Sequence, residues 1–284
     1  MKYGVHWTAR VSEASTIREA AHRAEELGYH SFGLPDHLIT SRPIIDPFVG
    51  LTIAAEATSE IKLSTMVVLS GLRRSVQLAR EIASLQSISG DRVEVGIGAG
   101  WVADERAILD RWTGKTPLQR ISTDLELLHC AFDNQLDETS KPECLDPDHM
   151  LAKSIARNTT RPTFMVAAGG PKMLQIASRL SDIAMITVPT DRRLTGEKPS
   201  LELLGEQIAY VTKESPQNTP PQIQFQIREY LPGADSPSSD LWSLRGSHSD
   251  IQERLAGLES LGVDYISLCT NNMDVMEGFA NDIF

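Results

Sequence analysis

The sequence predicts an α/β fold, a (β/α)8 TIM barrel, and three observations support this. Strand-like and amphipathic segments alternate along most of the 284 residues. About eight such units fit this length, and repeated strand–helix–strand units form parallel sheets. A helix, a glycine cap and a strand recur at 27–34 and 261–268. An open, doubly wound sheet is the alternative, although the clearest glycine turn comes late and lacks G-x-G-x-x-G.

The first half of the chain supplies four strands with helices between them. The predicted strands are 2–7, 31–34, 62–69 and 93–97, and the predicted helices are 16–27, 46–58, 75–89, 104–111 and 117–132. Ile17, Ala20 and Ala24 lie at helical spacing in the first helix, and Gly28 follows it as a C-cap. Asp46-Pro47 is typical of an N-cap and a first helical residue.

The second half repeats the pattern less evenly. The predicted strands are 163–168, 183–186, 222–231 and 265–268, and the predicted helices are 171–180, 201–212 and 249–261. The polar segments 133–160, 187–199 and 232–240 have no convincing periodicity and are predicted as loops. In a barrel, such loops are lids over the pocket or plain surface connections, and the sequence leaves both open for 133–160. We expect one domain over 1–284 with reduced insertions.

Composition excludes several classes of protein. Lys and Arg total 27 against 38 Asp and Glu, a net charge of −11, which argues against a nucleic-acid partner. The scattered Cys130, Cys144 and Cys269 have no metal-ligand spacing and form no even disulfide set. The start of the chain lacks the apolar core of a signal peptide, and no apolar run approaches the roughly 20 residues that span a bilayer. These features predict a soluble cytoplasmic protein.

A glycine turn follows the buried strand 163–168. Gly169-Gly170-Pro171 precedes an amphipathic helix, and proline suits the first helical position because its missing amide hydrogen is not needed there. Glycine lets backbone amides approach a ligand, and a helix N-terminus carries partial positive charge. The turn is a candidate phosphate site, with a purely structural βα turn as the alternative.

In a barrel, the residues that follow each strand form the pocket. They are His6 and Trp7, Asp36 and His37, 69–74, 98–101, 168–172, 228–230 and 269–272. This set has no serine in a nucleophile-elbow context. Asp36-His37 is a candidate acid–base or metal pair, but we expect no metal because no second histidine or carboxylate lies at ligand spacing. Glycine turns, tryptophan and cations suit a flat, phosphate-bearing cofactor.

An ordered series of short motifs resembles the bacterial-luciferase-like oxidoreductases that depend on flavin or deazaflavin F420. The similar segments are 24–29, Leu34-Pro35-Asp36-His37, Asp46-Pro47, 54–58, 61–65, 78–80, 87–92, 96–101, Glu105, Arg120 and 167–171. Their order fits from residue 1 to about 184, and the helix and strand before residue 268 are also similar. Each motif is weak alone, but the ordered set is specific, and it is most similar to the F420-dependent branch.

The resemblance implies a role for each matching position. Ala168, Gly169 and Gly170 would contact the cofactor phosphate, with Ala167 also in the cofactor site, while Gly98, Ala99 and Gly100 would border the ring and ribityl chain. Met66-Val67 falls where such proteins often carry a cis peptide bond behind the ring. Asp36 and His37 would lie near the ring of the cofactor. His37 would donate a proton or contact the ring, with Asp36 orienting it, and Trp101 would form a stacking wall. Trp101 replaces a glutamate of some F420 dehydrogenases, which makes sugar-phosphate oxidation less expected.

We expect F420 as the cofactor, with FMN as the alternative. The acidic tail of F420 needs cations, and Arg73 and Arg74, with Arg42 and Lys172, could supply them, unless this arginine pair is simply solvated. The expected activity is hydride transfer between reduced F420 and a C=C or C=N bond of a small organic substrate. The alternatives are an FMN-dependent monooxygenase served by a separate flavin reductase, and a non-catalytic flavin-binding relative. Proteins of this family commonly form homodimers.

Overall fold

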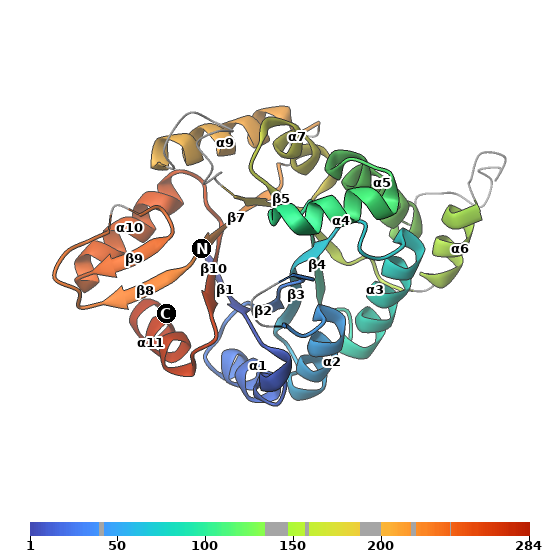
Figure 1. Cartoon of the computed structure of the whole chain (residues 1–284). Helices are drawn as coiled ribbons and strands as arrows, with labels where there is room; N and C mark the ends of the chain where they lie inside the picture. Colours follow the sequence, from blue (N-terminus) through green and yellow to red (C-terminus); the bar gives the residue numbers. More distant parts are fainter. Residues whose placement is uncertain (40–42, 134–146, 157–158, 188–199, 217–219, 239) are drawn as a thin grey trace.

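Eight parallel strands close into a barrel, which confirms the predicted fold and excludes the open sheet (Figure 1). The computed structural model describes residues 1–39, 43–133, 147–156, 159–187, 200–216, 220–238 and 240–284. The strand order around the barrel is β1-β10-β7-β6-β5-β4-β3-β2. The barrel strands are β1 Lys2–Trp7, β2 Ser31–Leu34, β3 Lys62–Leu69, β4 Val93–Gly98, β5 Thr163–Ala168, β6 Ile183–Ile186, β7 Gln222–Ile227 and β10 Tyr265–Thr270.

Helices surround the barrel (Figure 1). They are α1 Thr16–Glu26, α2 Pro47–Ala57, α3 Ser75–Ser89, α4 Ala103–Thr113, α5 Pro117–Phe132, α6 Pro147–Ile155, α7 Pro171–Leu180, α9 Leu201–Glu214, α10 His248–Ser260 and α11 Met273–Ile283. A single 3-10 turn, η1 Val11–Glu13, precedes α1. The predicted start of α2 is confirmed, because Asp46 Oδ1 accepts from Phe48 N at 2.9 Å and from Val49 N at 3.3 Å.

Strand side chains alternate between two hydrophobic cores. On β5, Phe164 and Val166 pack between the barrel and the helices, whereas Met165 packs in a cluster inside the barrel. That inner cluster consists of Met66, Met165, Ile183, Met185 and Tyr265. The inner face of the barrel therefore combines thioethers with a few polar side chains, and its carboxyl end is the place where a ligand can enter.

The single strand predicted at 222–231 is wrong. β7 ends at Ile227, and β8 Glu229–Pro232 pairs instead with β9 Ser243–Gly246 in a separate two-stranded sheet. The amides of Arg228 and Glu229 both donate to Trp242 O, so the chain leaves the barrel at this point. Pairing with a partner distant in sequence decides this boundary, and the apolar pattern of one segment cannot show it.

Two helices lie outside the predictions. The segment 133–160, predicted as a loop, contains α6, which packs against α3 and α5. The terminal helix α11 was not predicted, and it buries Met276 and Phe279. The loop predicted at 187–199 lies outside the described residues after Thr187. Within the described part of the chain, no helix has the length and apolar character needed to cross a membrane.

Candidate functional site

A histidine at the end of β2 is held by a buried glutamate from α4. His37 Nδ1 lies 3.0 Å from Glu105 Oε2, and the Glu105 side chain is fully buried. The other carboxylate oxygen, Oε1, accepts from Leu38 N at 2.7 Å and from Ile39 N at 2.8 Å. With Nδ1–H donating to Glu105, the Nε2 atom of His37 is left to meet a ligand. The His37 side chain is 19% exposed, so that ligand can reach it.

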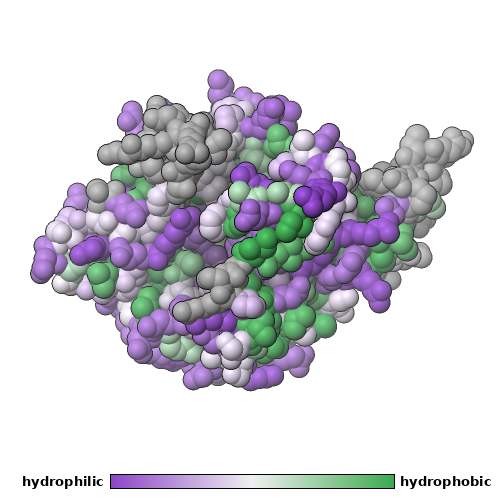
Figure 2. Space-filling model, viewed as in Figure 1, coloured by the Kyte–Doolittle hydropathy of each residue, from purple (hydrophilic) through white to green (hydrophobic). Residues whose placement is uncertain are grey.

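Trp101 lies beside this pair. Its ring meets the His37 ring edge-to-face at 5.8 Å between centroids, and the residue is 78% exposed. An exposed indole next to an oriented imidazole is consistent with the predicted stacking wall, and that role remains a prediction. Leu38 and Ile39 are also exposed after β2. Figure 2 shows hydrophobic side chains gathered near the middle of this face, which is otherwise largely polar.

Asp36 does not orient His37, so this part of the prediction is wrong. The buried Asp36 Oδ2 accepts instead from Leu69 N at 3.1 Å and from Arg73 Nη1 at 2.7 Å. Burial raises the pKa of the Asp36 carboxyl, against the opposing influence of Arg73. Asp36 thus ties the end of β2 to the end of β3. The side chains of adjacent residues point in different directions here, which leaves His37 to a partner from α4.

Arg73 is also placed differently from the prediction. Its guanidinium pairs with Asp36, with Asp46 and, at 2.8 Å, with Glu81, and it lies 5.2 Å over the Phe48 ring. Burial lowers the pKa of Arg73, but the three carboxylates outweigh burial and raise it. Because the side chain is only 8% exposed, it is already committed to these partners and is not a free cation for an acidic cofactor tail.

The other predicted cations differ in surroundings. Arg74 is largely exposed, and its guanidinium lies 3.7 Å from Asp148. Lys172 is exposed in the first turn of α7, next to the glycine turn. Arg42 lies outside the described residues. Of the two described side chains, Lys172 lies beside the candidate phosphate site.

The peptide bond Met66–Val67 is cis, as the resemblance implied. The glycines of β4 are explained by packing against this part of β3. A Cβ at Gly98 would come within 2.5 Å of Val67 Cγ2, and one at Gly96 within 2.2 Å of Thr65 O. Gly100 has a positive φ of 81° and Arg120 Nη2 donates to Ala99 O at 3.5 Å, so the turn that follows β4 is also fixed.

The glycine turn after β5 leaves a helix N-terminus open. Gly170 is the N-cap of α7, makes no side-chain cap, and would have nothing within 4 Å of an added Cβ. Among the described residues, nothing accepts from the amides of Lys172 and Met173. Gln207 Nε2 donates to Gly169 O at 2.7 Å and holds the turn. Such amides suit a phosphate.

Two alanines before this turn face opposite sides of the strand. Ala168 is buried against the helices, so only its backbone could approach a ligand. Ala167 packs against the inner cluster of the barrel. The structure therefore places both predicted positions at the carboxyl end of β5, but it gives their side chains different surroundings.

Glu105 has no role among the sequence-based predictions, although it belongs to the series of residues that resembles the family. The available signal was its place in the first turn of a helix just after the fourth strand, where an acid can reach the strand ends.

A second group of side chains, which consists of His6, Gln226 and Cys269, lies at the ends of β1, β7 and β10. In the part of the chain that the structure describes, no cluster of three or more His, Cys, Asp or Glu could hold a metal ion.

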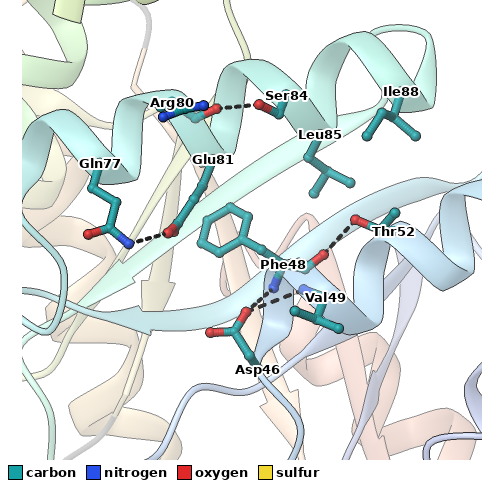
Figure 3. Close-up of a pocket in the computed structure, with 10 residues that line it drawn as sticks. All are labelled: Asp46, Phe48, Val49, Thr52, Gln77, Arg80, Glu81, Ser84, Leu85 and Ile88. Atoms are coloured by element: carbon teal, nitrogen blue, oxygen red, sulfur yellow. Dashed lines mark hydrogen bonds between the residues drawn. The ribbon is translucent and has the colours of Figure 1, made fainter.

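A groove of about 680 Å³ lies outside the barrel, between α2 and α3 (Figure 3). Asp46, Phe48 and Glu81 line this groove. The same three residues also contact the Arg73 guanidinium. The groove is therefore separate from the strand ends where His37, Trp101 and the glycine turn lie.

Parts of this chain are similar in sequence to known proteins. An uncharacterised protein of Mycobacterium tuberculosis is 34% identical over 112 residues, with 32% of this chain and 39% of the relative covered. The 5,10-methylenetetrahydromethanopterin reductase of Methanolobus tindarius is 31% identical over 173 residues, with 60% of this chain and 49% of the reductase covered. The chain thus spans less than half the length of these relatives.

Solved structures extend the likeness to the whole chain. The monooxygenase RslO1 from Streptomyces bottropensis has a TM-score of 0.75 at 18% identity, covering 100% of this chain and 98% of that one. The coenzyme F420-dependent tetrahydromethanopterin reductase from Methanopyrus kandleri has a TM-score of 0.72 at 13% identity, covering 99% and 98%. At these identities the likeness shows the fold. Residues 1–199 match the family model described as luciferase-like monooxygenase, and this chain therefore belongs to that family.

Proposed function

We propose that this protein is an F420-dependent oxidoreductase that transfers a hydride between the reduced deazaflavin and a C=C or C=N bond of a small organic substrate. The observation that carries the proposal is the His37–Glu105 pair at the end of β2. Reduction of a double bond needs a proton as well as a hydride, and His37 Nε2 is a partly exposed imidazole atom held in one orientation. When bound, reduced F420 supplies the hydride.

The residues present fit such a cofactor. The open amides at the start of α7 and the exposed Lys172 suit the phosphate. Inside the barrel, Ser64 Oγ, Gln224 Oε1 and Ser267 Oγ are buried without a hydrogen-bond partner among the described residues. Buried polar atoms of this kind normally bind water or a ligand.

The chain's own residues then have distinct tasks. Glu105 holds His37, and His37 Nε2 delivers or accepts the proton at the substrate. Asp36 and Arg73 fix the ends of β2 and β3, so that this edge of the pocket keeps its shape. Trp101 and the apolar residues after β2 limit the access of water. We propose that one barrel domain performs these tasks and that the protein works as a homodimer.

An FMN-dependent monooxygenase is the second candidate. The family description and the likeness to RslO1 favour it, and an open helix N-terminus accepts the phosphate of either cofactor. Arg73 no longer argues for the acidic tail of F420, because three carboxylates occupy its guanidinium.

A side-by-side binding and turnover experiment separates the two candidates. Dissociation constants for F420 and FMN are measured by fluorescence, and oxidation of reduced F420 is then followed with a panel of conjugated enones and imines. We expect F420 to bind more tightly and its reduced form to be consumed without oxygen. Binding of FMN alone, with oxygen-dependent product formation, would replace the proposal with the monooxygenase. Binding of neither would favour a non-catalytic relative.

A further inference from the structure

A second group of reactive side chains lies at the barrel mouth, on the strands β1, β7 and β10. His6 and Cys269 are direct neighbours across the β1–β10 pair. They share the inner face of the barrel, because alternate residues of β10 pack outward in the main core and inward in the inner cluster. Cys269 is partly exposed at this end of the barrel.

His6 points a buried, unused nitrogen into this region. The residue is 9% exposed, and its Nε2 atom has no hydrogen-bond partner among the described residues. Gln226 Nε2 pairs with His6 Nδ1. Since an amide nitrogen can only donate, Nδ1 accepts, which places the ring hydrogen on Nε2. A buried N–H without an acceptor is costly, and a thiolate or a ligand oxygen beside it would satisfy it.

The surroundings favour the charged form of the sulfur. Burial raises the pKa of the Cys269 thiol, but His6, the Thr8 hydroxyl at 3.9 Å and the positive charge of Arg228 outweigh burial and lower it to about 7. His6 acts from β1 and Arg228 from the end of β7, where its guanidinium lies 4.9 Å over the Trp242 ring. A thiolate near neutral pH is the nucleophilic form of cysteine.

We infer that Cys269 is a covalent modification site for small conjugated carbonyl compounds, with His6 Nε2–H as the hydrogen-bond donor that supports its sulfur. In the step, the thiolate sulfur bonds to the β-carbon of the alkene. The C=C π pair moves to the α-carbon, which takes a proton from water, so no oxidant or reductant is needed. This site involves neither His37 nor the glycine turn, and the inference does not depend on the proposed cofactor.

The test is alkylation by acrylamide, a small conjugated amide, followed by peptide mass spectrometry between pH 6 and 9. We expect Cys269 to react with a midpoint near 7, with Cys130 as a comparison in the same chain. An ordinary thiol would give a midpoint of about 8.5. His6→Asn keeps an acceptor for Gln226 but removes the Nε2 donor, and His6→Gln keeps a donor near the Nε2 position.

The two variants separate the role of His6 from general disruption. We expect His6→Asn to raise the midpoint by about one pH unit, which lowers the rate at pH 7 about fivefold, and His6→Gln to retain most of the shift. The inference is overturned if Cys269 titrates like an ordinary thiol, or if it reacts only after unfolding. It is also overturned if His6→Asn leaves the midpoint unchanged. Circular dichroism of each variant confirms that the reacting protein is folded.

Discussion

Glu105 accepts a hydrogen bond from His37 at 3.0 Å across 68 residues of sequence. Its second oxygen binds the amides of Leu38 and Ile39, so one buried carboxylate fixes both the ring and the backbone that carries it. In the proposed reaction, an orientation set in this way would cost little entropy at the moment of proton transfer. We regard Glu105 as a positioning residue for His37.

Replacing Glu105 by Gln tests this relationship. The amide oxygen can still accept from Leu38 and Ile39, but its NH2 group would face His37 Nδ1 and favour the opposite tautomer. We expect kcat to fall about tenfold to a hundredfold with little change in KM. The dependence of kcat on pH should also change. Asp104→Asn, an exposed acid in the same helical turn, is the matched control and should leave kcat unchanged. Equal kcat for both variants would contradict the role of Glu105.

The glycine turn can be tested at Gly170, where an added side chain has room. Its φ of −95° and ψ of 161° suit any N-cap residue, so Gly170→Asp should cap α7 and leave stability unchanged or a few tenths of a kcal/mol higher. The carboxylate would also occupy the phosphate position and repel the ligand. We expect affinity for a phosphate-bearing cofactor to fall at least tenfold in Gly170→Asp. The affinity should fall less in Gly170→Asn, whose side chain has the shape of aspartate but no charge. Unchanged affinity in both, measured by titration, would place the phosphate elsewhere.

Arg73→Met should destabilise the fold by about 3 kcal/mol, because it leaves Asp36 buried without its cation. The raised pKa of Asp36 determines how this loss of stability depends on pH. Without Arg73 that pKa rises further, so the folded state binds a proton more tightly than the unfolded chain. Stability then falls as pH rises through the folded-state pKa, and the loss is smaller in acid.

The measurement is urea unfolding of Arg73→Met at several pH values. The double variant Asp36→Asn/Arg73→Met removes the buried charge together with its partner, and it should recover part of the loss at neutral pH. A pH-independent loss that the second substitution does not relieve would mean that Arg73 acts through its contact with Phe48 instead.

Ionisation of Cys269 makes stability depend on pH in the opposite direction, so that stability rises as the pH rises. Its folded-state pKa of about 7 lies below that of an unfolded thiol, about 8.5, so ionisation favours the folded state. The contribution should be fully present above pH 8.5, reach about 2 kcal/mol, and be lost as pH falls through 7. The difference in unfolding free energy between the native protein and Cys269→Ser should therefore grow between pH 7 and 8.5. A constant difference would show that the pKa of the thiol is the same in the folded and the unfolded protein.

Several parts of the fold follow from local sequence alone. The alternation of strand and helix patterns, the N-cap at Asp46 and the glycine turn before Pro171 depend on residues a few positions apart, and the structure has each of them. The end of β7 could not be predicted in this way, because β8 is defined by pairing with β9. The helix α6 depends on packing against α3 and α5, which a polar segment does not reveal.

The same distinction between local sequence and long-range contacts applies to the candidate site. Strand period and turn chemistry are local, and they already place Asp36, His37 and Gly170 after the carboxyl ends of the strands. The partners of these side chains come from the folded arrangement: Glu105 for His37, Arg73 for Asp36, and His6 for Cys269. The physical reason is that hydrogen bonds and ion pairs act over a few ångströms in space. Closing the barrel brings together residues that the chain keeps tens or hundreds of positions apart.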